Sequence, residues 1–195
     1  MPDPAAIQTS AIRNFCMVLF AFIYMACNSF FIGSTSASIS PAPAGHLRPS
    51  PRTRLLVGTG LPPGARVLDA CAAPGGKTAA IASRVGAGGG VVACDPGRDA
   101  EARIRATLRS GGIGDGVRIH ARGVETLDPA LGPFDAVLVD APCSGLGTLR
   151  QHPEIRWRRT PRDLDELAAR QRRILDAASR FVREGGRLVY STCTI

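Results

Sequence analysis

Residues 61–195 alternate between short apolar runs and segments with apolar residues at helical spacing. The apolar runs are rich in Val, Ile and Leu and end at Gly, Asp or Cys, a pattern typical of buried strands. They predict five strands, at Arg66–Cys71, Gly90–Cys94, Val117–Ala121, Phe134–Asp140 and Arg187–Cys193. The periodic segments between them predict helices at Lys77–Val85, Arg98–Arg109 and Thr160–Val182. This alternation predicts an α/β fold with a parallel sheet, because parallel neighbours need a crossover connection.

The segment Thr160–Val182 carries the fullest helical signal. Thr160 suits the N-cap, Pro161 suits the first helical position, and Asp163 adds negative charge to the first turn. Apolar residues then recur every three or four positions, with Gln171 in the same stripe. We expect the Gly185-Gly186 pair to stop this helix.

Polar or reactive residues stand where four of the predicted strands end. These residues are Asp69, Asp95, Asp140 and Cys193. In open parallel sheets ligands bind at the carboxyl ends of the strands, near the switch in strand order. An Asp after a strand is also a common helix cap, so each residue alone says little, whereas the set predicts one site.

Residues 1–60 have a different character. Residues 15–32 carry no charge, and a helix of eighteen residues nearly crosses a hydrocarbon core of roughly 30 Å. A wrong start site or an out-of-family extension, a membrane anchor and a secretory signal all fit this segment. Residues 34–54 are rich in Ser, Pro and Arg and read as a linker, so the domain is expected at 61–195.

The chain is basic, with 24 Lys and Arg against 16 Asp and Glu and a net charge of +8. This charge favours an anionic partner such as a nucleic acid, without identifying one. Lys77 is the one lysine and falls in the turn CAAPGGKT, between the first predicted strand and helix.

This turn has small residues suited to close approach of a ligand. A P-loop needs Gly where Cys71 stands, and the dinucleotide G-x-G-x-x-G spacing is absent, so nucleotide triphosphate hydrolysis is disfavoured. Asp95 ends the next strand, where a carboxylate can accept both ribose hydroxyls. The turn and Asp95 together indicate a cofactor that contains adenosine.

Three segments, VLDACAAPGGKT, FDAVLVDAPCSGLGTLRQHPEIRWRRTP and GGRLVYSTCTI, stand in this order between residues 67 and 195. They resemble the signature segments of RNA (cytosine-5)-methyltransferases of the Sun/RsmB type. The resemblance implies a Rossmann-like class I sheet that binds S-adenosylmethionine (SAM), and RNA, above all ribosomal RNA, as the substrate. Such a sheet normally continues with two more strands, so residues 61–195 are expected to form a partial domain, incomplete at its C-terminal end.

The resemblance also implies covalent chemistry. A cysteine thiolate adds to C6 of cytosine, and C5 then attacks the methyl group of SAM. The resemblance makes Cys193 the nucleophile, Cys143 the residue that assists breakdown of the adduct, and Asp140 the contact to the base. In related DNA enzymes the Pro-Cys cysteine is the nucleophile, so the reverse assignment of Cys143 and Cys193 stays open.

The cofactor contacts follow from the same resemblance, and no metal is expected. They are Cys71, Ala72, Ala73, Pro74, Gly75, Gly76, Lys77, Asp95 and Asp140. The family normally has a further Asp after the third strand, where this chain has Ala121-Arg122-Gly123. One cofactor contact is therefore missing unless Asp128 or Glu125 replaces it. Cys94 is expected to be a small buried residue.

Eight arginines surround Trp157 between Arg150 and Arg173, with four acidic residues among them. We interpret this region as a face that contacts RNA phosphates, and residues 152–159 as non-helical. A solvated helix face is the alternative for the part after Pro161. The cysteine positions suit reduced thiols in the cytoplasm, with membrane contact only through residues 15–32. A truncated, inactive RNA- or SAM-binding remnant and a membrane-anchored fragment remain alternative functions.

Overall fold

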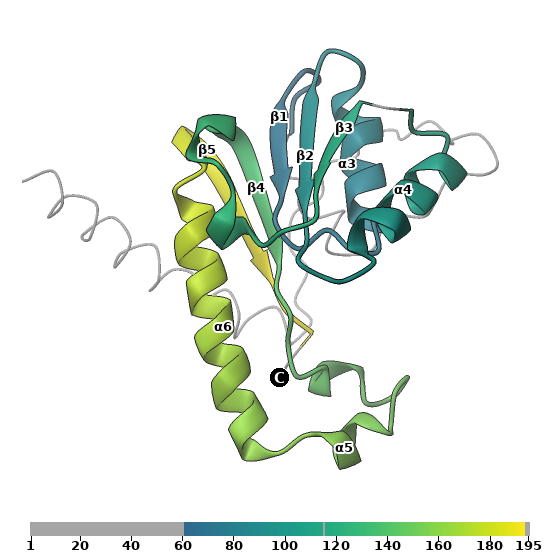
Figure 1. Ribbon diagram of the computed structural model, residues 1–195, viewed down its shortest axis with the longest axis vertical. Coiled ribbons are helices and arrows are strands. Elements are labelled where there is room, and N and C mark those ends of the chain that lie inside the picture. Colours follow the sequence, from purple (N-terminus) through teal and green to yellow (C-terminus); the bar gives the residue numbers. More distant parts are fainter. Residues whose placement is uncertain (1–60, 115, 194–195) are drawn as a thin grey trace, which may run out of the picture. The chain divides into compact units, whose positions relative to one another are not determined.

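The computed structural model describes residues 61–114 and 116–193 (Figure 1). These residues contain five strands: β1 (Arg66–Asp69), β2 (Gly90–Cys94), β3 (Val117–His120), β4 (Phe134–Asp140) and β5 (Val182–Ser191). The strands form one sheet in the order β3-β2-β1-β4-β5, and every neighbouring pair is parallel. The predicted α/β fold is confirmed, and the strand order reverses between β1 and β4.

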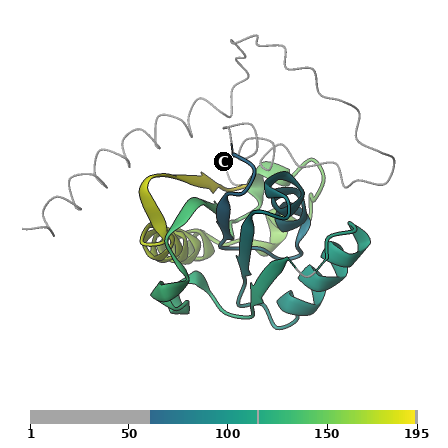
Figure 2. The ribbon, with the colours of Figure 1, turned by 90° about the horizontal axis from the view of Figure 1, so that it is seen from above.

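Helices cover both faces of this sheet (Figures 1 and 2). Helices α3 (Gly76–Val85) and α4 (Ala100–Ser110) lie on one face, and α6 (Pro161–Ser179) lies on the other. Shorter helices are η1 (Val124–Thr126), η2 (Pro129–Leu131), η3 (Leu146–Thr148) and α5 (Ile155–Arg158). Both faces of a parallel sheet are thus buried, which explains why its strands read as continuous apolar runs.

Alternate residues of each central strand enter two separate cores. In β1, Val67 packs with α3 and α4, whereas Leu68 faces the core shared with α6. Ile81 and Ile104 fill the first core, and Phe134 packs on Phe181 in the second, with ring centroids 6.3 Å apart. Because all neighbouring strands are parallel, their carboxyl ends lie at one edge of the sheet between these two cores.

The capping of α6 agrees with its sequence, but its C-terminal end does not. Thr160 and Asp163 form a capping box, as their spacing indicates. The helix ends at Ser179 rather than at Val182, because the chain turns there to bring Phe181 into the core. Gly185-Gly186 therefore lies inside β5, in a register shift against β4, and Gly185 has a φ of 69°.

Two other predictions concern helices. Residues 152–159 contain the one-turn helix α5, so their assignment as non-helical is wrong for Ile155–Arg158; a single turn is too short to show periodicity. None of the helices within 61–114 and 116–193 is long and apolar enough to cross a membrane. The predictions for residues 1–60, including the apolar segment 15–32, lie outside the described residues.

Candidate active site

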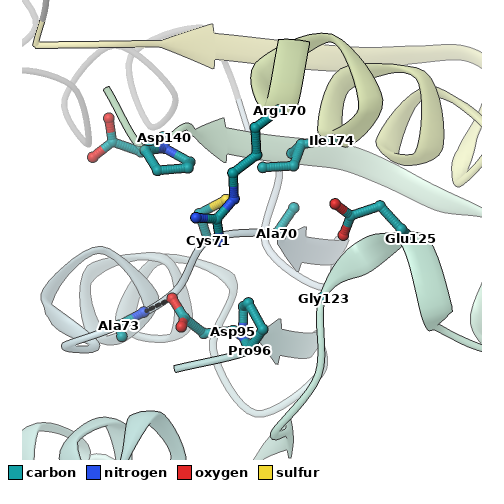
Figure 3. Close-up of a pocket in the computed structure, with 11 residues that line it drawn as sticks. Ala70, Cys71, Ala73, Asp95, Pro96, Gly123, Glu125, Asp140, Arg170 and Ile174 are labelled. Atoms are coloured by element: carbon teal, nitrogen blue, oxygen red, sulfur yellow. Dashed lines mark hydrogen bonds between the residues drawn. The ribbon is translucent and has the colours of Figure 1, made fainter. Parts of the chain in front are cut away.

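A pocket of about 240 Å³ lies at the carboxyl ends of the strands (Figure 3). Three carboxylates line it, each following a different strand: Asp95, Glu125 and Asp140. Its other lining residues come from the turn after β1, from the loops after β2, β3 and β4, and from α6. They are Ala70, Cys71, Ala73, Pro96, Gly123, Pro142, Arg170 and Ile174.

The turn between β1 and α3 forms one wall of the pocket. The Ala72 amide donates to the Cys94 carbonyl, and the Ala73 amide donates to Oδ2 of Asp95 at 3.1 Å (Figure 3). Gly75 has a φ of 105°, and a Cβ there would lie 3.0 Å from the Ile104 Cα. Glycine is therefore required at position 75 both for its backbone conformation and for the close packing of the turn on α4.

Asp95 is held in place from two sides. Its Oδ1 accepts a hydrogen bond from the Gly97 amide at 2.9 Å, while Oδ2 accepts from the Ala73 amide. Each carboxylate oxygen can accept more than one hydrogen bond. Asp95 is thus fixed by the backbone and can still accept hydroxyl groups from a ligand.

Asp140 ends β4 and takes part in an ion pair. Lys77 Nζ lies 3.0 Å from Oδ2 of Asp140, and the Ser191 hydroxyl donates to Oδ1 at 2.8 Å. Lys77, which the family resemblance implies as a cofactor contact, is not among the residues that line this pocket. Its ammonium group is instead turned to Asp140, which links α3, β4 and β5.

Asp69, which ends β1, does not line the pocket. It is fully buried, and Oδ2 accepts a hydrogen bond from the Thr78 hydroxyl at 2.7 Å. Burial raises the pKa of Asp69 to about 6, against the opposing effect of the Lys77 charge. Four strand ends therefore do not form one open site: Asp69 belongs to the interior beneath the turn.

The two strand-end cysteines are adjacent. Neighbouring strands β4 and β5 bring the Cα atoms of Cys143 and Cys193 to 6.2 Å, and the structure joins the two as a disulfide. The expectation that all cysteines are reduced is therefore wrong for this pair. Cys143 directly follows Pro142, which lines the pocket. Cys193 lies two residues after Ser191, whose hydroxyl donates to Asp140.

The remaining described cysteines have no such arrangement. Cys94 is buried, as expected, and its thiol donates to the Ala70 carbonyl. Burial and four nearby carboxylates raise the pKa of Cys71 to about 12. A thiol with this pKa stays protonated at neutral pH and is a poor nucleophile.

The structure separates the two candidates for the missing acidic contact. Glu125 lines the pocket, whereas Asp128 caps η2 by accepting a hydrogen bond from the Ala130 amide at 2.9 Å. Glu125 reaches the pocket because position 123 is Gly: a Cβ there would overlap Oε2 of Glu125. Figure 3 shows Glu125 and Arg170 pointing into the same space from η1 and α6.

The sequence did not indicate the roles of two residues at the site, Gln171 and Arg170. Gln171 donates to the Pro142 carbonyl at 2.8 Å and accepts from the Tyr190 hydroxyl at 3.0 Å, so it ties α6 to β5 and to the loop before Cys143. A polar residue inside an apolar helical stripe was the available signal. Arg170 was placed on the RNA face, and nothing in its spacing indicated that it lines a pocket.

The sheet and the turn between β1 and α3 define the class of protein. The described residues form part of a Rossmann-like SAM-dependent methyltransferase domain. Residues 60–195 match the family model described as 16S rRNA methyltransferase RsmB/F, and the chain belongs to this family. Among the described residues, no cluster of three or more His, Cys, Asp or Glu is placed to hold a metal ion.

Two curated relatives are named ribosomal RNA small subunit methyltransferase B. The chain is 42% identical over 139 residues to that of Xanthomonas campestris, covering 69% of this chain and 31% of the relative. It is 43% identical over 135 residues to that of Sodalis glossinidius, covering 66% of this chain and 30% of the relative. The chain thus spans less than a third of the length of these relatives.

Solved structures agree with this assignment. NSun6 from Pyrococcus horikoshii, whose structure contains the SAM analogue SFG, is 31% identical with a TM-score of 0.65, covering 75% of this chain and 37% of that one. A methyltransferase homologue from the same organism is 30% identical with a TM-score of 0.62, covering 74% and 44%.

Proposed function

We propose that this chain transfers a methyl group from SAM to C5 of a cytosine in ribosomal RNA, through a covalent adduct between Cys193 and C6. One observation carries the proposal: two cysteines lie side by side where β4 and β5 end, next to Asp140 at the edge of the pocket. The similarity to relatives named for ribosomal RNA supports the substrate class.

The residues of the pocket fit SAM. The methyl group of SAM must arrive at the cysteines, which follow β4 and β5. From there across the sheet to β3, the residues at the strand ends match the methionine, ribose and adenine groups of the cofactor in turn. Asp140 and Cys71 lie nearest the cysteines and would contact the methionine part. Asp95 would accept the ribose hydroxyls, and Glu125 would accept the adenine amino group. Asp95 keeps acceptor capacity beyond its two backbone contacts, as a ribose diol requires.

The reaction requires the cysteine pair as thiols, so a thiol reductant must first open the Cys143–Cys193 disulfide by thiol–disulfide exchange. The Cys193 thiolate adds to C6 of cytosine, forming a C–S bond and making C5 electron-rich. When bound, SAM would supply an electrophilic methyl group on its sulfonium; transfer of this group to C5 would break the S–CH3 bond and leave S-adenosylhomocysteine. Cys143 then assists loss of the C5 proton, the C5–C6 double bond re-forms, and the C–S bond breaks to return the Cys193 thiolate.

Asp140 and Gln171 position the groups for this sequence. Asp140, as the carboxylate of the Lys77 ion pair, accepts a hydrogen bond from the cytosine amino group. Gln171 holds the carbonyl of Pro142 and so fixes the backbone just before Cys143. A target cytosine in a duplex must be unpaired before its C6 reaches Cys193.

Transfer of tritiated methyl from SAM to ribosomal RNA, measured under reducing conditions, tests the proposal. Cys193→Ala should abolish transfer, and Cys143→Ala should slow it and leave protein bound covalently to RNA. Cys27→Ala, which replaces a cysteine of the uncharged segment 15–32, is the control and should transfer methyl at the wild-type rate. Transfer that survives Cys193→Ala but is lost in Cys143→Ala would reverse the two roles. RNA binding without transfer or adduct would instead identify a non-catalytic remnant.

A further inference from the structure

An exposed indole stands on α5, close to the loop that carries Cys143. Trp157 is 83% exposed, and the other large hydrophobic side chain exposed in the described part of the chain, Leu164, is 40% exposed. Trp157 has no aromatic partner among the described residues. A large aromatic surface left in water is typical of a contact site for a partner.

The charges around this indole select an anionic partner. Arg150, Arg156 and Arg158 are exposed and form no ion pair with any described residue. The nearby Glu154 lies against His152, with Nδ1 and Oε1 3.3 Å apart. Three arginines without a carboxylate partner favour phosphate groups, while the indole favours a flat aromatic group.

Contacts attach α5 to the loop that carries Cys143. Arg159 Nε donates to the Ser144 carbonyl at 3.1 Å, and Ser144 follows Cys143 directly. Ile155 packs on the same loop so tightly that a Cβ on Gly145 would lie 3.0 Å from its Cδ1. The indole is therefore held at a defined position relative to the cysteine pair.

We propose that Trp157 stacks on an unpaired base of the RNA strand that flanks the target cytosine, while Arg150, Arg156 and Arg158 contact the phosphates. This inference rests on the proposed function for the identity of the partner. It adds that the bound segment is single-stranded beyond the target base itself, because a base within a duplex cannot expose its face to the indole.

The sequence contains one tryptophan, so fluorescence excited selectively at tryptophan reports on Trp157 alone. The full chain, without SAM, is titrated with a single-stranded RNA of about 12 nucleotides, which spans a site of this kind. We expect the single strand to quench the fluorescence, and the duplex of the same sequence and polyglutamate to cause little quenching. By filter binding, Trp157→Ala should weaken single-strand binding about tenfold, and Trp157→Phe should restore most of it.

Leu164→Ala is the matched control, because it removes the other exposed large side chain, and its affinity for RNA should equal that of the wild type. Unchanged affinity in Trp157→Ala, absence of RNA binding, or equal quenching by duplex and single strand would overturn the proposal. Quenching by polyglutamate would also overturn it and identify an acidic protein surface as the partner. Because SAM is absent, a failure of methyl transfer leaves this result unaffected.

Discussion

The pocket at the carboxyl ends of the strands and helix α5 both adjoin the loop that carries Cys143, and they are built in opposite ways. The pocket contains three carboxylates and small residues whose backbone amides fix the positions of the side chains. Arg156 and Arg158 of α5 are exposed and form no ion pair with any described residue. The difference indicates that one side is shaped in advance for a small ligand, whereas the other adapts to a flexible polymer.

The two regions should therefore respond differently to mutation and to salt. Removing a fixed carboxylate leaves the groups that donate hydrogen bonds to it without an acceptor, because few other groups can move to replace it. Exposed arginines each contribute little, and their effect is screened by salt. Both expectations can be tested by measuring the affinity for the cofactor product and for RNA in the same variants.

Asp95→Ala should have the largest effect on cofactor binding. It removes the acceptor for the Ala73 and Gly97 amides as well as the proposed ribose contact. Charge-assisted hydrogen bonds of this kind together contribute about 3 kcal/mol, so calorimetry should show about hundredfold weaker binding of S-adenosylhomocysteine. Binding of single-stranded RNA should not change, and a parallel loss of RNA affinity would show that the two regions are not independent.

Asp69→Asn should change the pH dependence of stability. Burial raises the pKa of Asp69 to about 6, so the folded protein holds this proton more tightly than the unfolded chain. The resulting contribution to the free energy of unfolding is about 3 kcal/mol. It is fully present below about pH 4 and is lost as the pH rises through 6. The free energy of unfolding, measured by urea denaturation at several pH values, should fall between about pH 4 and pH 6 in the wild type but not in Asp69→Asn.

Asp135 is the matched control for this experiment. Hydrogen bonds from the Arg66 amide and the Arg183 guanidinium lower the pKa of Asp135. Its contribution to stability is therefore present above the unfolded pKa and is lost as the pH falls, the opposite sign to Asp69. Variants of Asp69 and Asp135 with the same pH dependence would contradict both assignments.

Glu125→Gln should weaken S-adenosylhomocysteine binding about fivefold, by removing a charged acceptor from the proposed adenine end of the pocket. Gly123→Ala should have a similar effect at little cost in stability, since the new Cβ displaces the flexible end of Glu125. Asp128→Asn, outside the pocket, should bind the product as the wild type does. Equal affinities in all three variants would place the adenine elsewhere.

Arg158→Ala should have the smallest effect, about threefold on RNA affinity at low salt. The slope of log affinity against log salt should fall by about 0.7, as expected for one lost phosphate contact to a single strand. Arg162→Ala is the comparison, because Arg162 is already paired with Glu166 at 3.0 Å. An unchanged slope in Arg158→Ala would exclude a phosphate contact at this position.

The local patterns of the sequence predicted most elements, because strand and helix periodicity depend on near neighbours. The end of α6 is the main exception: its pattern continues to Val182, but the packing of Phe181 on Phe134 ends the helix early. The same packing leaves Gly185-Gly186 within β5, where glycine permits the register shift.

The sequence by itself determined the α/β class, the parallel strands and the carboxyl-end position of Asp95, Asp140, Cys143 and Cys193. Only the tertiary structure decided which of the other polar side chains near these strand ends line the pocket and which are buried or paired. It buried Asp69, turned Lys77 to Asp140 and brought Glu125 rather than Asp128 to the pocket. The physical reason is that periodicity places a residue along its own element, whereas its partners come from segments far away in the chain.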